Sequence, residues 1–255
     1  MPQRIVFILS TSRTGTKALA EGLACDDVIS PHQPPFSRLL TIASNYYLHG
    51  WLPEWFIKNL IFLIREPQIA SASRRYYIQV FSLDHIPAKY LYDKHQDMSI
   101  IHIVRDARTF VPSYLNWMRT KTKSFIANKF VPGWHPSGFF TGAIPFKEWV
   151  RMKPYQKVSW HWAYKNRFIE NTFRESDRYI RIFFEELFSE KGPHVLEEAL
   201  SRAGIPYRNS FDKIFATKKN VSKKNACPLW EKWPEKHKLE LTRICGDLMR
   251  RYGYL

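Results

Sequence analysis

The feature that most constrains the fold is a buried strand near the N-terminus that runs through a short polar loop directly into a helix. Residues 4–9 are almost entirely apolar, as in a buried strand, and residues 16–23 place apolar side chains on one face of a helix. Apolar runs and helical segments continue to alternate along the chain. This order predicts an α/β fold with a mostly parallel central sheet flanked by helices, in which ligands bind beyond the carboxyl ends of the strands.

Periodicity and turn-rich breaks predict the remaining elements. We expect further strands at residues 28–30, 89–92, 100–104 and 179–183. We expect further helices at residues 36–47, 54–73, 106–118, 155–175, 195–203 and 237–252. Residues 36–75 then form a helical insertion, and residues 121–145 form a long mobile loop of a kind that is uncommon unless functional. No repeat or linker interrupts the sequence, so we expect a single domain over residues 1–255.

The composition narrows the class of protein. Hydrophobic residues make up 45% of the chain and charged residues 24%, which excludes a disordered chain, a collagen-like chain and a coiled-coil fibre. The three Cys residues are scattered without metal-ligand spacing, which favours a reducing compartment over a disulfide framework or a zinc site. Because the apolar stretches are too short for a signal peptide or a spanning helix, we expect a soluble cytoplasmic protein.

The charge of the chain favours an anionic partner. Lys and Arg number 39 against 23 Asp and Glu, which gives a formal net charge of +16 and attracts phosphate or sulfate groups. Residues 10–17, here called the anion loop, suit such a group. Small residues let backbone N–H groups face an anion, Gly15 permits a tight turn, and Arg13 and Lys17 add positive charge. The loop lacks the Walker A pattern, so a nucleotide triphosphatase or a kinase is disfavoured.

A second strand-to-helix junction carries a further anion motif. Arg105 follows the strand expected at residues 100–104, and Ser113 lies about two turns along the next helix. Both side chains could therefore reach one phosphate group, the guanidinium through two parallel bonds and the hydroxyl as a donor. Two anion sites at adjacent strand ends predict one ligand with two phosphate groups.

The two junctions together resemble the P-loop-like sulfotransferase family. Arg13-Thr14-Gly15-Thr16 matches its first loop, and the interval of eight residues between Arg105 and Ser113 matches its second motif. The resemblance implies a P-loop NTPase-like sulfotransferase fold and the co-substrate 3′-phosphoadenosine 5′-phosphosulfate (PAPS). It implies that Arg105 and Ser113 hold the 3′-phosphate. It also implies that the 5′ end is surrounded by Ser12, Arg13, Thr14, Gly15, Thr16 and Lys17.

The resemblance extends more weakly over most of the chain. Residues 160–169 are similar to the family's long helix beside the nucleotide, and residues 179–187 to the strand and acidic turn that follow it. Residues 219–222 are similar to its basic loop over the cofactor, which implies that Lys219 and Asn220 bind the cofactor. Lys17 departs from the family pattern, because a small hydroxyl residue is usual at its position.

The resemblance implies a reaction that moves a sulfuryl group from PAPS to a hydroxyl or amine and releases 3′-phosphoadenosine 5′-phosphate (PAP), without a metal ion. Arg13 and Lys17 would stabilise the sulfuryl oxygens. Two residues are candidates for the base that takes the acceptor's proton, namely His32 and His95, which are both expected to follow strands. Asp93 is the next candidate after them. Gln33 stands where some bacterial members have an acidic residue, which keeps an inactive relative as an alternative.

The acceptor is expected to be a glycan, a lipid or a small molecule. Two basic clusters, at residues 74–77 and 121–129, would either recognise an anionic or glycan acceptor or form a solvated face. Aromatic side chains that could cover the acceptor are Trp134, Phe139 and Phe140. The other alternative is a non-catalytic nucleic-acid or nucleotide-binding protein, since the chain is basic and rich in aromatic residues. The placement of both anion motifs at strand-to-helix junctions disfavours a nucleic-acid partner.

Overall fold

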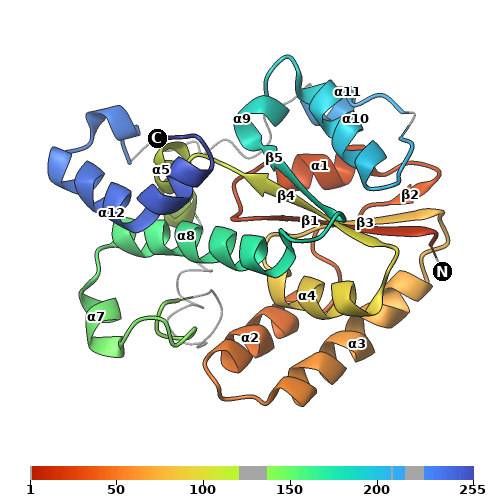
Figure 1. Ribbon diagram of the computed structural model, residues 1–255, viewed down its shortest axis with the longest axis horizontal. Coiled ribbons are helices and arrows are strands. Elements are labelled where there is room, and N and C mark those ends of the chain that lie inside the picture. The colour runs from red at the N-terminus through yellow and green to blue at the C-terminus, as the bar shows by residue number, and fades with distance from the viewer. Residues whose placement is uncertain (1, 121–136, 208, 216–226) are drawn as a thin grey trace.

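The structure is a computed structural model that describes residues 2–120, 137–207, 209–215 and 227–255 (Figure 1). Within these residues five strands form one sheet in the order β2-β3-β1-β4-β5, and every neighbouring pair is parallel. The strands are β1 Arg4–Ser10, β2 Val28–Ile29, β3 Tyr76–Val80, β4 Met98–Val104 and β5 Tyr179–Phe183. The predicted α/β fold with a parallel central sheet is therefore confirmed.

Strand β1 lies in the middle of the sheet, between β3 and β4. Its register pairs Ile8 with Val80 on one side and Ser10 with Ile103 on the other, so the carboxyl ends of the three strands lie next to one another. The strand order changes direction at β1, because β2 and β3 lie on one side of it and β4 and β5 on the other. Ligands of such sheets bind at this switch point, beyond the carboxyl ends.

Alternate residues of β1 point to opposite faces of the sheet, as the pleat of a strand requires. Val6 and Ile8 pack in one buried cluster, whereas Ile5, Phe7 and Leu9 pack in another. Helices α1 Thr16–Leu23, α10 Gly192–Arg202 and α11 Asp212–Phe215 cover the first face. Helices α2 Ser37–Leu48, α3 Glu54–Ala70, α4 His85–Lys94 and α8 Pro154–Phe173 cover the second face (Figure 1).

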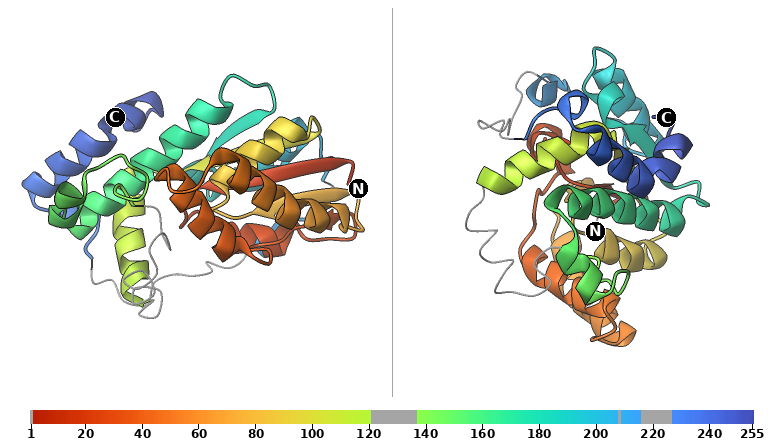
Figure 2. Two further views of the ribbon diagram at one scale, coloured as in Figure 1. Left: turned by 90° about the horizontal axis from the view of Figure 1, so that it is seen from below. Right: turned by 90° about the vertical axis from the view of Figure 1, so that its left-hand side faces the viewer.

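A third buried cluster joins the carboxyl edge of the sheet to the C-terminal helix. It contains residues of α5 Ala107–Thr120, α8 and α12 Glu235–Arg251, among them Phe110, Trp162 and Leu248. Helix α12 lies along α8, as Figure 2 shows. The remaining short elements are α7 Phe146–Arg151, α9 Phe184–Leu187 and the 3₁₀ turn η1 Trp230–Lys232. No helix in the part of the chain that the structure describes is both long and apolar enough to cross a membrane.

The sequence prediction is wrong between residues 74 and 95. The strand expected at residues 89–92 is part of α4, whose Ile86, Tyr90 and Leu91 pack against the sheet. The third strand is β3, which the pattern did not predict because both of its faces are buried and its apolar and polar residues do not alternate. The helix expected at residues 54–73 ends earlier, at Ala70, because the chain turns there to enter β3.

Candidate functional site

The anion loop leaves β1 with an uncommon backbone conformation. Ser12, Arg13 and Gly15 have φ angles of 79°, 57° and 72°, in the left-handed region that residues other than Gly rarely adopt. A Cβ atom at Gly15 would lie 2.3 Å from Cζ of Phe188, so a side chain at this position would have to displace the Phe188 ring. Strained backbone of this kind concentrates at sites that bind ligands.

Hydroxyl groups fix the shape of the anion loop from within. Ser10 Oγ accepts hydrogen bonds from Thr14 Oγ1 at 2.8 Å and from the Ser12 backbone N–H at 3.3 Å. Ser12 Oγ shares a hydrogen bond of 2.6 Å with Ser82 Oγ, which lies just beyond the carboxyl end of β3. The ends of β1 and β3 are thereby connected directly at the switch point.

The two predicted anion motifs contact each other. Arg13 Nε donates a hydrogen bond of 3.3 Å to Ser113 Oγ on α5, and a guanidinium N–H of Arg105 donates one of 2.5 Å to the backbone oxygen of Arg13. Residues from the loop after β1 and from the junction after β4 therefore form one site at the carboxyl edge of the sheet. The sequence-predicted residues Ser12 to Lys17, Arg105 and Ser113 all lie at this site.

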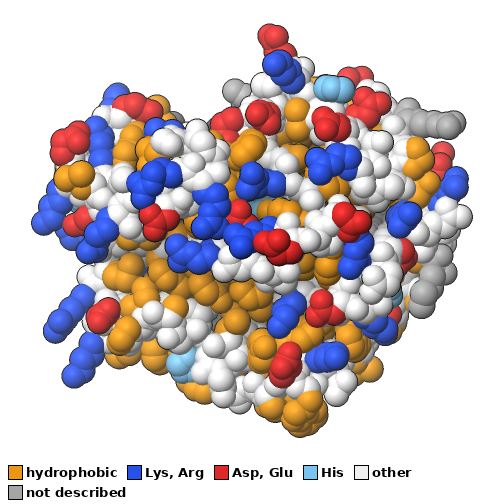
Figure 3. Space-filling model, viewed as in Figure 1, with side chains coloured by type: hydrophobic (Ala, Val, Ile, Leu, Met, Phe, Trp, Pro, Cys, Tyr) orange, Lys and Arg blue, Asp and Glu red, His pale blue; other side chains and the backbone are white. Residues whose placement is uncertain are grey.

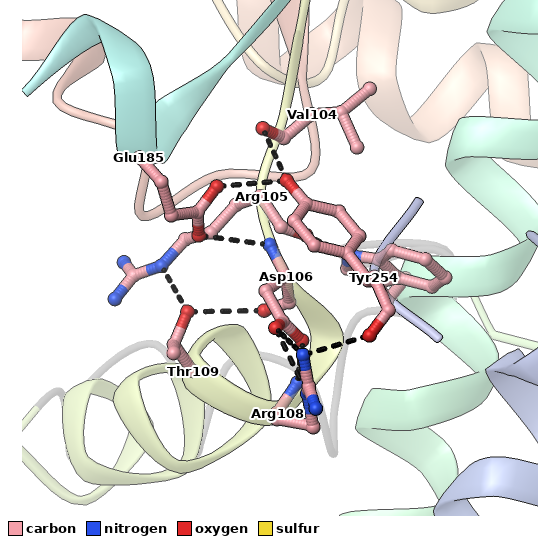
Figure 4. A network of polar contacts seen from close by, with 8 residues as sticks. Val104, Arg105, Asp106, Arg108, Thr109, Glu185 and Tyr254 are labelled. Carbon is pink, nitrogen blue, oxygen red and sulfur yellow. Dashed lines mark hydrogen bonds and ion pairs between the residues drawn. The ribbon is translucent and has the colours of Figure 1, made fainter. Parts of the chain in front are cut away.

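A network of polar contacts positions Arg105 (Figure 4). Its Nε donates to Thr109 Oγ1 at 3.1 Å, and its backbone oxygen accepts a hydrogen bond of 2.7 Å from Trp162 Nε1. Its guanidinium also lies 4.3 Å from the centre of the Phe184 ring. Glu185 holds the junction in place, because its carboxylate accepts hydrogen bonds from the backbone N–H of Asp106 at 3.1 Å and from the Tyr254 hydroxyl at 2.8 Å.

Two guanidinium groups of the site, those of Arg13 and Arg105, are partly buried. Burial lowers the pKa of Arg105 to about 10, the nearby charge of Glu185 opposes this shift, and Arg13 adds to it. Burial likewise lowers the pKa of Arg13. Both guanidinium groups stay protonated at neutral pH, so two partly desolvated cations lie side by side. An anion is the group that would stabilise this arrangement.

His32 lies beside the anion loop, just beyond the carboxyl end of β2. Its Nε2 is 3.3 Å from Thr16 Oγ1, and its ring packs edge-on against Phe81. Burial lowers the pKa of His32, the charge of Lys17 lowers it further, and Glu21 opposes both effects. The imidazole is therefore neutral at pH 7 and able to accept a proton. Gln33 is exposed and has a φ of 91°.

His95 lies at the opposite edge of the sheet, so the expectation that it follows a strand is wrong. It follows α4 and precedes β4, whose seven residues span roughly 20 Å. Its Nε2 is 2.8 Å from the Glu66 carboxylate, and Asp93 is exposed in the last turn of α4. The geometry therefore gives neither residue a place beside the anion loop.

Several other predicted residues lie away from the anion loop or outside the described residues. Arg75 is exposed at the start of β3, also at the amino edge, and donates to Gln3 Oε1 at 2.6 Å. Phe139 and Phe140 pack around His49 near the end of α2. Outside the described residues lie Lys219, Asn220, Trp134, the cluster at residues 121–129 and most of the loop expected at residues 121–145.

The basic side chains do not gather in one stripe on the face shown in Figure 3. Lys and Arg are spread over this face, and Asp and Glu lie among them. Proteins that track a nucleic-acid backbone use a continuous positive groove. This face offers no such groove.

Sequence reasoning missed a group of buried polar side chains on the second face of the sheet, here called the buried polar cluster. It consists of Arg65 of α3, Asp84 and His85 at the start of α4, and Lys165 of α8. Asp84 forms an ion pair of 3.2 Å with Arg65. The signal for Lys165 was present in the sequence, because it lies within the apolar stripe of residues 155–175 that includes Trp162 and Ile169.

Comparisons with known proteins identify the fold. No protein-family model and no curated protein matches the sequence. The sulfotransferase domain from the curacin biosynthetic pathway is similar at a TM-score of 0.54 and 19% identity, over 97% of this chain and 98% of that chain. A sulfotransferase from Alicyclobacillus acidocaldarius is similar at a TM-score of 0.53 and 14% identity, over 98% and 94%. Mouse sulfotransferase SULT7A1, solved in complex with PAP, is similar at a TM-score of 0.50 and 14% identity, over 98% and 86%. The chain therefore has the P-loop-like fold of the sulfotransferases.

Proposed function

We propose that this protein is a sulfotransferase that moves a sulfuryl group from PAPS to a hydroxyl or amine of an acceptor and releases PAP. The observation that carries the proposal is the contact between the two anion motifs, in which Arg13 Nε donates to Ser113 Oγ and Arg105 donates to the Arg13 backbone oxygen. A single ligand with phosphate groups at both ends of a nucleoside would satisfy both motifs. The sulfotransferase fold supports the same conclusion.

The residues at the carboxyl edge fit such a ligand. The left-handed backbone at Ser12 and Arg13 lets backbone N–H groups of the loop face an anionic group. We assign the 5′ end of PAPS to the anion loop and the 3′-phosphate to Arg105 and Ser113. Lys219 and Asn220 are proposed to cover the cofactor, as the family resemblance implies.

The side chains at the site have distinct roles in the proposed reaction. Bound PAPS would supply the sulfuryl group. Arg13 and Lys17 stabilise charge on the sulfuryl oxygens, and this cationic environment makes a metal ion unnecessary. His32 accepts the proton of the acceptor, because it lies beside Thr16 and its neutral form is favoured. With His32 in this role, the residue at Gln33 need not be acidic, so the enzyme is proposed to be active.

The acceptor is proposed to be a small molecule, a lipid or a glycan with a free hydroxyl or amine. The test is to incubate the protein with PAPS and a panel of phenols, alcohols, amines and oligosaccharides, and to measure both PAP and the sulfated product. We expect PAP and product in equal amounts, and we expect Arg105→Ala to reduce both at a PAPS concentration that half-saturates the wild-type protein. Binding of PAP no tighter than that of adenosine would overturn the proposal.

A further inference from the structure

Lys165 of α8 is a lysine whose whole side chain is buried in the protein. Its side chain has an exposed fraction of 0%, and Nζ has no hydrogen-bond partner among the residues that the structure describes. His85 lies in the same cluster with an exposed fraction of 2%. Both of its ring nitrogens also lack a partner in hydrogen-bonding geometry within the described residues, although the backbone of Leu83 lies near the ring.

The carboxylate of the buried polar cluster is already engaged by other groups. Asp84 accepts hydrogen bonds from Arg65 at 3.2 and 3.3 Å and a further one from the side-chain amide of Gln79. Arg65 also donates to Ser37 Oγ at 2.8 Å. Arg65 and Lys165 can therefore supply two positive charges to the cluster, against the single negative charge of the Asp84 carboxylate. A buried ammonium that lacks its own partner is costly, so it either loses its proton or binds an anion.

The pKa values of Lys165 and His85 reflect this lack of a second carboxylate. Burial lowers the pKa of Lys165 to about 7, and the Asp84 carboxylate opposes the shift only in part. Burial and the charge of Lys165 lower the pKa of His85 well below its usual value, so its ring is neutral and carries one N–H donor. An anion bound here could pair with the Lys165 ammonium and accept a hydrogen bond from the His85 ring N–H.

Two separate series of neighbouring residues link the buried polar cluster to the anion loop. Ser82, which shares a hydrogen bond with Ser12, is two residues before Asp84 in the chain. On the other path, His161 lies one turn before Lys165 on α8, and its ring centre is 5.5 Å from that of Tyr114. Tyr114 neighbours Ser113, the partner of Arg13. The cluster is therefore beside the proposed reaction site, on the face covered by α2, α4 and α8.

We propose that Lys165 and His85 form an anion-binding subsite that takes a carboxylate of the acceptor. This inference rests on the proposed function, because it names the class of acceptor for the same site. The Lys165 ammonium pairs with the carboxylate, and the His85 N–H donates to its second oxygen. A carboxylate fits better than a neutral group, because only an anion neutralises the second cation. The subsite would thus select acceptors that carry an acid group as well as the reacting hydroxyl or amine.

The experiment compares small carboxylates with their neutral amides as stabilising ligands. Formate, acetate and 4-hydroxybenzoate are each matched by formamide, acetamide and 4-hydroxybenzamide. The Tm is measured with and without saturating PAP, which occupies the anion loop. The variant is Lys165→Met, with Lys165→Gln as a second variant in case the first does not fold. Lys157→Met is the matched control, because Lys157 lies on the same helix with Nζ 5.3 Å from the Trp149 ring centre.

At least one carboxylate should raise the Tm of the wild-type protein and of Lys157→Met by about 2–4 °C more than its amide does. This difference should vanish in Lys165→Met, whose own Tm without ligand should be higher than that of the wild type. Equal shifts by every carboxylate and its amide in the wild type would overturn the subsite, as would a preference that survives in Lys165→Met. The same samples report PAP binding, and its absence would overturn the proposed function separately.

Discussion

Arg13 and Ser113 are separated by 100 positions in the sequence, yet Arg13 Nε donates a hydrogen bond of 3.3 Å to Ser113 Oγ. The contact joins the loop after β1 to the helix after β4, so the groups proposed for the two ends of PAPS are not independent. A change at Ser113 removes a donor to the 3′-phosphate and also releases the Arg13 side chain. This coupling sets the expected pattern of the mutational effects.

Arg105→Ala should weaken PAP more than adenosine 5′-phosphosulfate, because only PAP carries the 3′-phosphate. Loss of a charge-assisted contact costs about 1.5–3 kcal/mol, so the Kd for PAP should rise roughly 10- to 150-fold. Ser113→Ala should have a smaller effect on PAP and a measurable one on adenosine 5′-phosphosulfate, since Arg13 is released as well. Isothermal titration with both ligands measures this. Arg75→Ala, at the far edge of the sheet, is the control and should change neither Kd.

Gly15→Ala should damage the site more than the same change at Gly50. Both residues have a positive φ, 72° and 82°, so both variants carry a backbone cost of about 1–2 kcal/mol. Only at Gly15 does the added Cβ meet another group, the Phe188 ring. We expect Gly15→Ala to lose more stability in urea and at least about tenfold in PAP affinity, the change that a shift of 1.4 kcal/mol produces. Equal losses in the two variants would show that the Phe188 contact does not matter.

His32→Asn should lower turnover by roughly 10²- to 10⁴-fold while leaving PAP binding intact, as loss of a positioned general base does. Burial and Lys17 lower the pKa of His32, so the neutral base persists below its ordinary pKa and activity should fall only at lower pH. Glu21→Gln should move this acidic limb to still lower pH, because Glu21 raises the pKa. The assay is the pH dependence of kcat with an acceptor from the panel. His95→Asn is the control, and a similar loss of turnover there would contradict the assignment.

Lys165→Met should change how stability depends on pH. The pKa of Lys165 is lowered on folding, so between about 7 and 10.5 the unfolded chain binds more protons and wild-type stability rises with pH. Below pH 7 the lysine is protonated in both states, and the cost of burying its charge is fully present. Lys165→Met should therefore exceed the wild type in stability at pH 6, with an advantage that shrinks by at most ~1.4 kcal/mol per pH unit above pH 7. Urea unfolding at several pH values measures this, and a less stable variant at pH 6 would contradict it.

The parts of the fold and site that were predictable are those with strong local patterns. The run from β1 through the anion loop to α1 combines an apolar strand, small loop residues and an amphipathic helix, and the Arg105 to Ser113 interval lies within one strand-to-helix junction. Their meeting follows from the rule that parallel strands end at one edge of a sheet.

The parts that were missed depend on tertiary contacts. Strand β3 is buried on both faces and includes the polar Gln79, so no alternation of apolar and polar residues marks it. Without β3, the sequence placed His95 after a strand and did not expect Ser82, Asp84 and His85 at the carboxyl edge. Helical spacing places Lys165 in the apolar stripe of α8, but lysine is a residue type that is almost never fully buried, so its residue type alone suggested an exposed side chain.

The most direct test of the central claim is isothermal titration of the protein with PAP and with adenosine 5′-monophosphate, which differs from PAP only in lacking the 3′-phosphate. If one ligand satisfies both anion motifs, PAP should bind about 10- to 150-fold more tightly, the factor expected from one charge-assisted phosphate contact. Equal affinities for the two nucleotides would contradict the assignment of Arg105 and Ser113 to a 3′-phosphate, and with it the proposal that the protein uses PAPS.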